Sequence, residues 1–242
     1  MRYLILCLLV TTQVVEGVKA QDTMSTDRPD FTESALTVGQ GTLQLEAGFT
    51  HQSAGDTHFL TTGEGLIRYG LRPRFEVRVG LPSYLSSEAI DNGLSDVSLG
   101  FKWNLANLNN GISAGLIAGV TLPTGDLGAD DPNPSIILVA SKPLTKGLSM
   151  ATQVSSTLFK MAEEWQNLWI GTAVVGAPIN NTLGAFVEIK IEKNQDMDAR
   201  FVFHTGLLFA VSDDFQLDLH VGTGMNDSSG DEFIGLGFAF RR

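Results

Sequence analysis

The 242-residue chain contains one cysteine, Cys7, which lies in a segment that we expect to be removed. Residues 1–20 have the layout of a signal peptide, with a basic Arg2, a short apolar core over residues 4–10 and a small residue, Ala20, at the expected cleavage point. Cleavage after Ala20 would leave a mature chain without cysteine. The sequence therefore predicts an exported protein that no disulfide stabilises.

Long apolar runs, helical periodicity and an excess of basic charge are also lacking. The apolar core of residues 4–10 is far too short to cross a membrane as a helix, and no segment repeats its apolar residues with a period of about 3.6. The 16 basic residues are outnumbered by 27 acidic ones. Nucleic acid is not an expected partner, because its phosphates require a basic surface.

The chain contains instead a repeated alternation of apolar and polar residues, which is the pattern of half-buried β-strands. Within residues 75–81, every second residue from Phe75 onward is apolar, and Glu76, Arg78 and Gly80 lie between them. About twelve such segments occupy residues 42–52, 58–71, 74–83, 96–106, 111–122, 135–142, 147–158, 167–176, 183–192, 199–210, 215–224 and 232–240. Both faces of the sixth segment are apolar, so its phase is ambiguous, and the eighth is only moderately clear.

The connections between these segments alternate in length. Short ones cover residues 71–74, 106–111, 143–147, 177–182 and 211–214, and longer polar ones cover 83–95, 123–134, 159–166, 193–198 and 225–231. Short turns at one end and longer loops at the other are typical of outer-membrane barrels, and an even strand count places both termini in the periplasm.

A soluble β domain would show the same alternation, but three features favour a membrane barrel. The segments are close to the nine to eleven residues, roughly, that a tilted membrane strand needs, whereas soluble strands average about five or six. A soluble barrel of about twelve strands would require a large apolar filling. Formal charges fall on one face only in the clear segments, as contact with hydrocarbon requires. We therefore expect an all-β protein, a transmembrane antiparallel β-barrel of about 12 strands over residues 42–242.

The polar face of these strands is expected to line the lumen. Its charged and titratable members are Glu46, Glu64, Arg68, Glu76, Arg78, Lys102, Glu188, Lys190, Glu192, Arg200, His204, Asp218 and His220. Candidates for the aromatic girdles at the membrane interfaces are Tyr69, Tyr84, Trp103, Trp165, Trp169 and Phe240, with ordinary β packing as the alternative.

Catalytic, metal and cofactor sites are not indicated. His204 has no serine in a Gly-x-Ser-x-Gly motif to activate, and the four histidines lack the spacing of metal ligands. The aspartates of residues 126–131 lack the spacing of a calcium loop and are expected to be solvated or bridged to lipopolysaccharide. We expect no enzyme activity and no cofactor.

The residues before the first expected strand resemble the start of a bacterial outer-membrane family. The matching stretches are Asp27-Arg28-Pro29-Asp30-Phe31-Thr32-Glu33-Ser34, Val38-Gly39-Gln40-Gly41, Gln44-Leu45-Glu46-Ala47-Gly48, Arg68-Tyr69-Gly70-Leu71, residues 75–80, and Gly235-Leu236-Gly237-Phe238. The family is the transporter family named for the MetA pathway of phenol degradation. The resemblance implies an outer-membrane β-barrel and a link to aromatic catabolism.

Residues 21–41 form a charged arm at the expected periplasmic mouth of the barrel. Three of its acids, Asp27, Asp30 and Glu33, are candidate partners for the inward Arg68 and Arg78, and its Arg28 is a candidate partner for a lumen glutamate. Pro29 restricts the preceding residue and favours an extended arm. The arm is then either an inward plug or a solvated terminus, and the sequence does not separate the two.

Two classes of function follow from this reading. The first is an outer-membrane channel or transporter for passive uptake of small solutes, with hydrophobic or aromatic ones as candidates. The second is a non-conducting barrel with a structural or surface-interaction role. The expected partners are the lipid and lipopolysaccharide of the bacterial outer membrane, a small-molecule solute, and the barrel-assembly machinery during biogenesis.

Overall fold

The computed structural model describes residues 24–89, 91–145, 147–161, 163–229 and 232–242, and the expected signal peptide of residues 1–20 lies outside these ranges. No helix in the described ranges is long and apolar enough to cross a membrane. The described strands are β1 (Leu43–Ala54), β2 (Thr57–Thr62), β3 (Leu66–Arg72), β4 (Phe75–Gly80), β5 (Tyr84–Ser87), β6 (Gly93–Leu94), β7 (Val97–Asn107), β8 (Ser113–Leu122), β9 (Asn133–Pro143), β10 (Ser149–Met161), β11 (Glu164–Pro178), β12 (Leu183–Lys193), β13 (Arg200–Ser212), β14 (Phe215–Gly224) and β15 (Glu232–Arg241).

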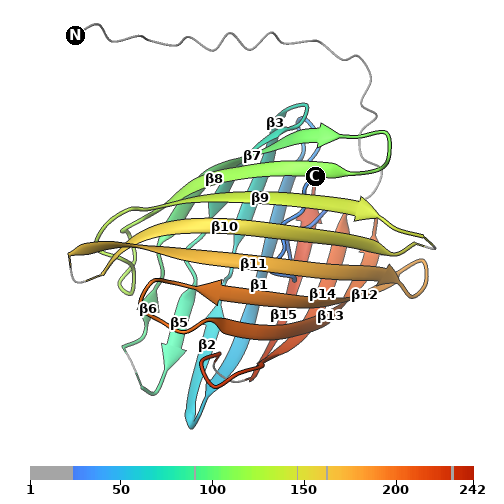
Figure 1. Cartoon of the computed structure of the whole chain (residues 1–242). Helices are drawn as coiled ribbons and strands as arrows, with labels where there is room; N and C mark the ends of the chain where they lie inside the picture. Colours follow the sequence, from blue (N-terminus) through green and yellow to red (C-terminus); the bar gives the residue numbers. More distant parts are fainter. Residues whose placement is uncertain (1–23, 90, 146, 162, 230–231) are drawn as a thin grey trace, which may run out of the picture.

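These strands form one antiparallel sheet that closes into a barrel, because β1 pairs with β3 on one side and with β15 on the other (Figure 1). Three barrel strands are each divided in two, as β2 with β3, β4 with β5, and β6 with β7. The 15 described segments therefore make 12 barrel strands, and the expected fold class is confirmed. We call the end with the short turns and the C-terminus the inner end, and the opposite end the outer end.

The divisions lie at similar heights in neighbouring strands. Gly63 has a positive φ of 99° at the first break, where glycine is favoured because it has no Cβ. Pro82 stands at the second break and has no N–H group to give to the ladder. Beyond the breaks the outer parts continue the sheet, since β5 pairs with both β2 and β6.

Asp96, at the third break, holds the neighbouring loop at the outer end. Its carboxylate accepts hydrogen bonds from the backbone N–H groups of Thr124, Gly125 and Ala129, each at 2.9 Å. Burial raises the pKa of Asp96, but the three N–H groups outweigh that effect and hold the pKa below its ordinary value. The ionised form of Asp96 therefore ties this loop to the barrel.

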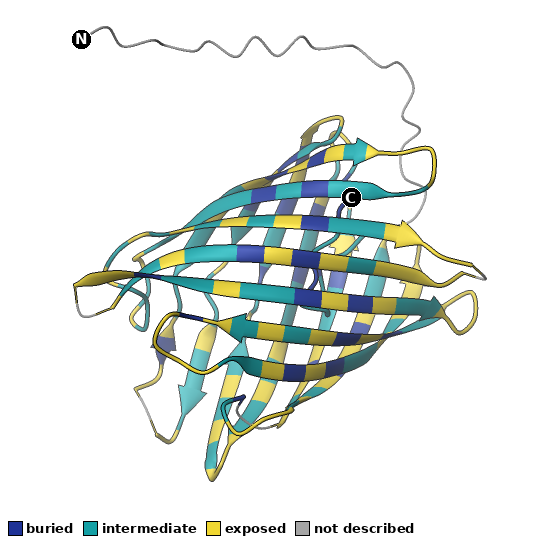
Figure 2. Ribbon diagram, in the orientation of Figure 1, coloured by how far each residue is buried: buried dark blue, intermediate teal, exposed yellow. Residues whose placement is uncertain are grey.

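Alternate residues of each strand face opposite sides of the wall, which produces the bands of buried and exposed residues in Figure 2. Along β12, Val187, Ile189 and Ile191 are exposed on the outside, whereas Phe186 and Glu188 are buried inside. The outside of the barrel is thus an apolar belt. The candidate girdle residues Tyr69, Tyr84, Trp103, Trp165, Trp169 and Phe240 are all exposed.

Two of the expected connections are wrong. β10 and β11 pair as far as Met161 and Glu164, so a tight turn replaces the longer loop expected over residues 159–166. The connection expected over residues 83–95 contains β5 and β6. Near the outer ends of β10 and β11, polar residues lie on both faces, such as Lys160 on one and Gln166 on the other, so the sequence pattern there resembles a loop.

The ambiguous sixth segment is resolved as β9. Ile136 and Leu138 are exposed on the outside and Val139 is buried inside. Its lumen face is apolar because it contacts other protein there: the backbone of Ala35 lies close to Gly115 of β8, beside Val139.

Candidate functional site: the luminal arm

Residues 24–41 lie inside the barrel, first as a closed loop and then as a segment along the wall. The hydroxyls of Ser25 and Ser34 are 2.6 Å apart, and the Asp27 carboxylate accepts a hydrogen bond from the N–H of Ser34 at 2.8 Å. The prediction of an extended arm, which rested on Pro29, is therefore wrong. Its two ends meet, so the residues between them form a loop that enters the lumen and returns.

The second part of the arm leads to β1 along β3 and β4. The N–H of Val38 donates to a carboxylate oxygen of Glu76 at 2.7 Å. The N–H of Gly41 donates to the carbonyl of Gly70 at 2.8 Å. These contacts attach residues 35–41 to the wall independently of the loop.

Asp27 lies among three buried cations. Its carboxylate oxygens are 2.7 Å from Arg78 Nη1, 2.7 Å from Lys102 Nζ and 3.2 Å from Arg68 Nη1. Glu33 adds a contact of 2.9 Å to Arg78 Nη2. Because an unpaired buried charge is strongly unfavourable, the arm and this part of the wall depend on each other.

Glu46 and Glu76 complete the cluster from the wall. Both pair with Arg68, at 2.8 and 2.9 Å. Glu46 also accepts hydrogen bonds of 2.9 Å from the backbone N–H groups of Asp27 and Arg28. The wall therefore grips the arm through its backbone as well as through its charges.

The arm's only arginine reaches the opposite side of the loop. Arg28 pairs with Glu64 at 2.9 Å and with Asp218 at 3.4 Å. Its guanidinium lies over Gly48 and Gly237, which are paired across β1 and β15. A Cβ added at either glycine would lie 2.3 or 2.4 Å from guanidinium atoms. The two glycines therefore leave the space that the guanidinium occupies, and any larger residue would fill it. We call this space the glycine seat.

The expected pairing of Asp30 with Arg68 or Arg78 is wrong. Asp30 forms no ion pair within the described chain, because the loop turns between Asp27 and Glu33 and directs Asp30 away from those arginines. It borders a cavity of about 310 Å³ near the inner end, together with Val174 and Phe186.

The tip of the loop is attached to the far wall at Glu188 of β12. This carboxylate accepts hydrogen bonds from the N–H of Phe31 (2.8 Å), the N–H of Thr32 (2.8 Å) and the hydroxyl of Thr32 (2.6 Å). His204 Nδ1 is 2.7 Å from Glu188, and His204 Nε2 is 3.0 Å from His220 Nδ1. All five residues thus form one connected network.

The remaining expected lumen residues lie toward the outer end. Glu192 joins Lys190 at 2.7 Å and Arg200 at 3.2 Å. Lys190 Nζ also lies 3.9 Å from the ring centre of Phe31. These three side chains are half-buried, whereas Glu46, Arg68, Glu76, Lys102, Glu188 and His204 are almost fully buried.

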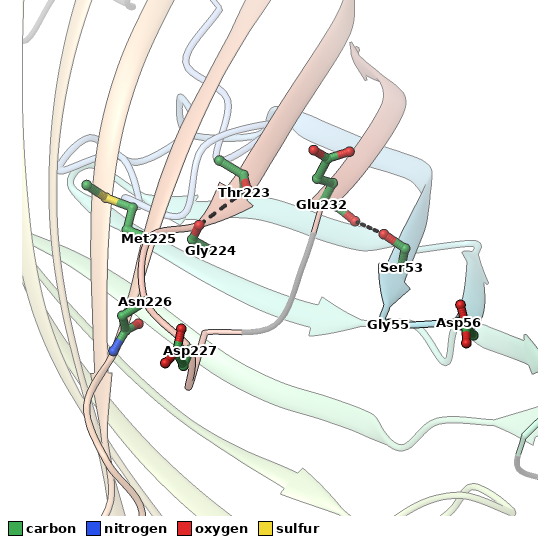
Figure 3. Close-up of a pocket in the computed structure, with 9 residues that line it drawn as sticks. All are labelled: Ser53, Gly55, Asp56, Thr223, Gly224, Met225, Asn226, Asp227 and Glu232. Atoms are coloured by element: carbon green, nitrogen blue, oxygen red, sulfur yellow. Dashed lines mark hydrogen bonds between the residues drawn. The ribbon is translucent and has the colours of Figure 1, made fainter.

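An open hollow of about 740 Å³ lies at the outer end, between the β1–β2 turn and the β14–β15 connection (Figure 3). Asp56, Asp227 and Glu232 give its rim three carboxylates. We call it the outer hollow. Within the described ranges, no group of three or more histidine, cysteine or acidic side chains is placed to hold a metal ion.

Sequence reasoning missed the uncharged part of the site. Gln153 Oε1 accepts from the N–H of Glu33 at 2.8 Å, and Thr172 contacts the Thr32 hydroxyl at 2.6 Å. Asn104 donates to the carbonyl of Ala35 at 2.9 Å. The alternation that identified charged lumen residues contained the needed signal, since these residues occupy the same inward positions.

Comparison with solved structures shows which barrels share this fold. The COG4313 outer membrane channel from Pseudomonas putida F1 superposes with a TM-score of 0.65 at 14% identity, covering 86% of this chain and 98% of that one. The KdgM porin gives 0.58 at 12% identity, with coverages of 81% and 98%. The β domain of the Bordetella autotransporter BrkA gives 0.53 at 9% identity, with coverages of 84% and 99%. No curated protein matches the sequence.

These identities establish the fold, which is that of outer-membrane barrels. Two of these proteins are a channel and a porin by name rather than enzymes, in line with the expected absence of catalysis. The closed barrel and its apolar outer belt place the chain in the bacterial outer membrane. Residues 26–241, which include both the arm and the barrel, match a single family. The chain belongs to the family described as "Putative MetA-pathway of phenol degradation".

Proposed function

We propose that the protein is an outer-membrane channel for passive uptake of small solutes, hydrophobic or aromatic ones among them, and that residues 24–34 are a removable plug. One observation carries the proposal: the loop contacts opposite walls of the lumen, at Arg78 of β4 and Glu188 of β12. The wall itself is closed by the pairing of β1 with β15. The plug can therefore leave without opening the barrel.

The names of the structural neighbours support conduction. One neighbour is called an outer membrane channel and another a porin. The short turns at the inner end and the longer loops at the outer end are consistent with a periplasmic inner end and an extracellular outer end. On this reading the solute enters at the outer end. Lipid and lipopolysaccharide surround the apolar belt, and the barrel-assembly machinery inserts the chain.

A reversible lock tests the plug directly. The hydroxyls of Thr32 and Thr172 are 2.6 Å apart, so cysteines at both positions are placed to form a disulfide between the loop and β11. The only natural cysteine is Cys7, in the expected signal peptide. We expect the oxidised T32C/T172C variant to be silent in planar bilayers and to conduct after reduction.

Deletion of residues 21–34 is the complementary test. It should raise conductance while heat-modifiable gel migration still reports a folded barrel. The deletion removes four acids and one arginine and leaves Arg68, Arg78 and Lys102 facing Glu46 and Glu76, so selectivity should shift toward anions.

The two single-cysteine variants are the controls, because neither can form the disulfide. If a folded barrel without its loop is silent, and reduction of the locked variant changes nothing, the channel proposal is wrong. The non-conducting structural or surface-interaction barrel would then stand.

A further inference from the structure

Two carboxylates of the loop lie side by side on the same two cations of the wall. Asp27 and Glu33 contact different nitrogens of one guanidinium: Arg78 Nη1 lies 2.7 Å from Asp27, and Arg78 Nη2 lies 2.9 Å from Glu33. Lys102 Nζ lies 2.7 Å from both carboxylate oxygens of Asp27 and 3.5 Å from Glu33. Arg78 and Lys102 therefore hold two carboxylates at once, and we call this pair of cations the carboxylate cradle.

The carboxylate cradle depends on the loop for its close acidic partners. Among the described residues, one further acid forms ion pairs with the cradle, namely Glu76, at 3.5 Å from Arg78 and 3.9 Å from Lys102. Glu76 already accepts from Arg68 at 2.9 Å and from the N–H of Val38 at 2.7 Å, and both contacts remain when the loop leaves. The released loop therefore leaves the cradle with one distant, shared carboxylate in place of two close ones.

A cradle without anions is unfavourable inside the barrel. Lys102 is fully buried and Arg78 nearly so while the loop is docked, and a buried charge that loses its partner is strongly destabilising. Without the loop, the wall part of the cluster has three cations and two acids, which are Arg68, Arg78, Lys102, Glu46 and Glu76. The cluster is then net positive, so an anion in the lumen is drawn to the cradle.

A molecule with two carboxylates fits the cradle better than a molecule with one. A monocarboxylate in the position of Asp27 would leave Arg78 Nη2 without its acceptor. When both carboxylates belong to one molecule, the second contact is intramolecular and costs little further freedom of motion. The two carboxylates must lie on the same side of that molecule, because Nη1 and Nη2 are neighbours on one planar guanidinium.

The cradle is reached from the side of Glu33. The side chain of Glu33 is 20% exposed, whereas those of Asp27 and Arg78 are 4% and 9% exposed. Glu33 also borders the cavity of about 310 Å³ near the inner end. An incoming carboxylate therefore replaces Glu33 on Arg78 first, and exchange at Asp27 follows as the loop detaches.

We propose that the carboxylate cradle of Arg78 and Lys102 binds a small dicarboxylate solute with both carboxylates on the same side, and that Asp27 and Glu33 are its built-in occupants. Such a solute replaces both acids of the loop and so favours the released loop. The site rests on the proposed function, because a loop that never leaves has no cradle to offer. It adds a class of anion to the solutes of the channel.

Maleate and fumarate separate the geometry of the ligand from its charge. Both are dicarboxylates of the same composition, but maleate has its carboxylates on one side of the double bond and fumarate has them on opposite sides. Thr32 is 3% exposed, so a cysteine there should react slowly with a water-soluble methanethiosulfonate reagent until the loop leaves.

We expect saturating maleate to raise the labelling rate of full-length T32C about tenfold or more, at an ionic strength held constant with chloride. Fumarate, propionate and inorganic phosphate should each have a much smaller effect. Propionate offers one carboxylate, and phosphate offers negative charge without the two carboxylates.

Removing the built-in occupants should expose the cradle directly. In full-length D27N/E33Q the loop no longer competes, so maleate should bind about tenfold or more tightly than to the wild type in calorimetric titrations. Adding R78Q should abolish that binding. Adding R72Q should leave it unchanged, because Arg72 is exposed at the inner end of β3 and lies outside the cradle. Heat-modifiable gel migration checks that each variant is a folded barrel.

Three results would each overturn the site. They are equal effects of maleate and fumarate on T32C labelling, equal binding of maleate by the wild type and D27N/E33Q, and unchanged binding after R78Q is added. The comparison of maleate with fumarate needs no change in the cradle, so it decides the matter even if R78Q prevents folding.

Binding and conductance separate the two proposals. A chain that conducts after reduction of the T32C/T172C lock, but whose D27N/E33Q form does not bind maleate, keeps the channel function and loses the cradle. A chain that binds maleate, but whose unlocked barrel is silent, loses the channel function, and the cradle is then a ligand site of a closed barrel.

Discussion

Replacing Asp27 with asparagine should release the plug while keeping its shape. Both carboxylate oxygens of Asp27 accept hydrogen bonds, one from Ser34 N–H and Lys102, the other from Arg78 and Lys102. An asparagine has one oxygen, so its NH₂ group must face donors on one side. The substitution therefore breaks the centre of the buried cluster without changing its volume.

The Asp27→Asn substitution destabilises the docked state of the loop and not the released state. In the released loop Asp27 is solvated, so the substitution changes little there. Breaking a buried ion pair by removing one partner costs about 3–5 kcal/mol, and a tenfold change in an equilibrium constant corresponds to about 1.4 kcal/mol. The ratio of docked to released loop should therefore fall by a factor between about 10² and several thousand.

Single-channel recording measures this ratio as open probability. The matched control is Asp30→Asn, because Asp30 forms no ion pair in the described chain. We expect D27N to raise open probability by orders of magnitude and D30N to leave it near the wild-type value. An unchanged D27N channel, or a D30N effect of equal size, would refute the assigned role of the charged cluster.

Three further substitutions test the glycine seat, the lipid-facing side of the wall and the loop held by Asp96. Gly237→Ala should raise open probability, because its Cβ would lie 2.4 Å from the arm's guanidinium, while Gly171→Ala, with no atom within 4 Å of the added Cβ, should not. Val187→Arg, in the middle of the exposed face of β12, should lower folding stability in vesicles by about 2–4 kcal/mol in urea titrations. The folded-state pKa of Asp96 lies below its unfolded value of about 3.9. Its stabilisation of the loop is therefore complete above that pH and is lost as the pH falls through the folded pKa. Hydrogen exchange in residues 123–129 should rise on acidification toward pH 3 beyond its intrinsic change, and Asp96→Asn should abolish that dependence.

Alternation predicted the wall of the barrel well because one physical requirement acts on every strand. Hydrocarbon on one side rejects charge, so Val187 and Glu188, adjacent in sequence, take opposite faces. The alternation of apolar and polar residues weakens where strands leave the apolar belt, as near Gln166. It also weakens where protein fills the lumen, because an inward residue such as Val139 can then be apolar. The wrong connection over residues 159–166 lies at a place of the first kind, and the ambiguous phase of the sixth segment at a place of the second kind.

The partners of the arm were less predictable, because they depend on how the loop turns. Asp27 and Asp30 are three residues apart and equally acidic, yet Asp27 lies among three cations and Asp30 forms no ion pair with any described residue. Their difference follows from the contact between Ser25 and Ser34 that closes the loop. No local sequence pattern predicts that contact. The glycine seat formed by Gly48 and Gly237 is equally unpredictable from the sequence, since the two residues are 189 positions apart and meet only when the barrel closes.

The polar character of the plug is consistent with a segment that has to leave. A buried ion-pair cluster can often be replaced by apolar residues with no loss, or with a gain, of stability, so stability alone does not explain Asp27, Arg28 and Glu33. An apolar loop would dock more firmly but would expose apolar surface to water on release. Charged side chains regain hydration when released, which offsets part of the loss of the ion pairs and lowers the free-energy cost of release. We therefore expect apolar replacement of the pair Asp27 and Lys102, as in D27L/K102M, to restore docking lost in D27N and to produce a barrel that stays closed. A D27L/K102M channel that opens as readily as D27N would contradict this argument, because it would show that apolar residues cannot hold the plug as the charges do.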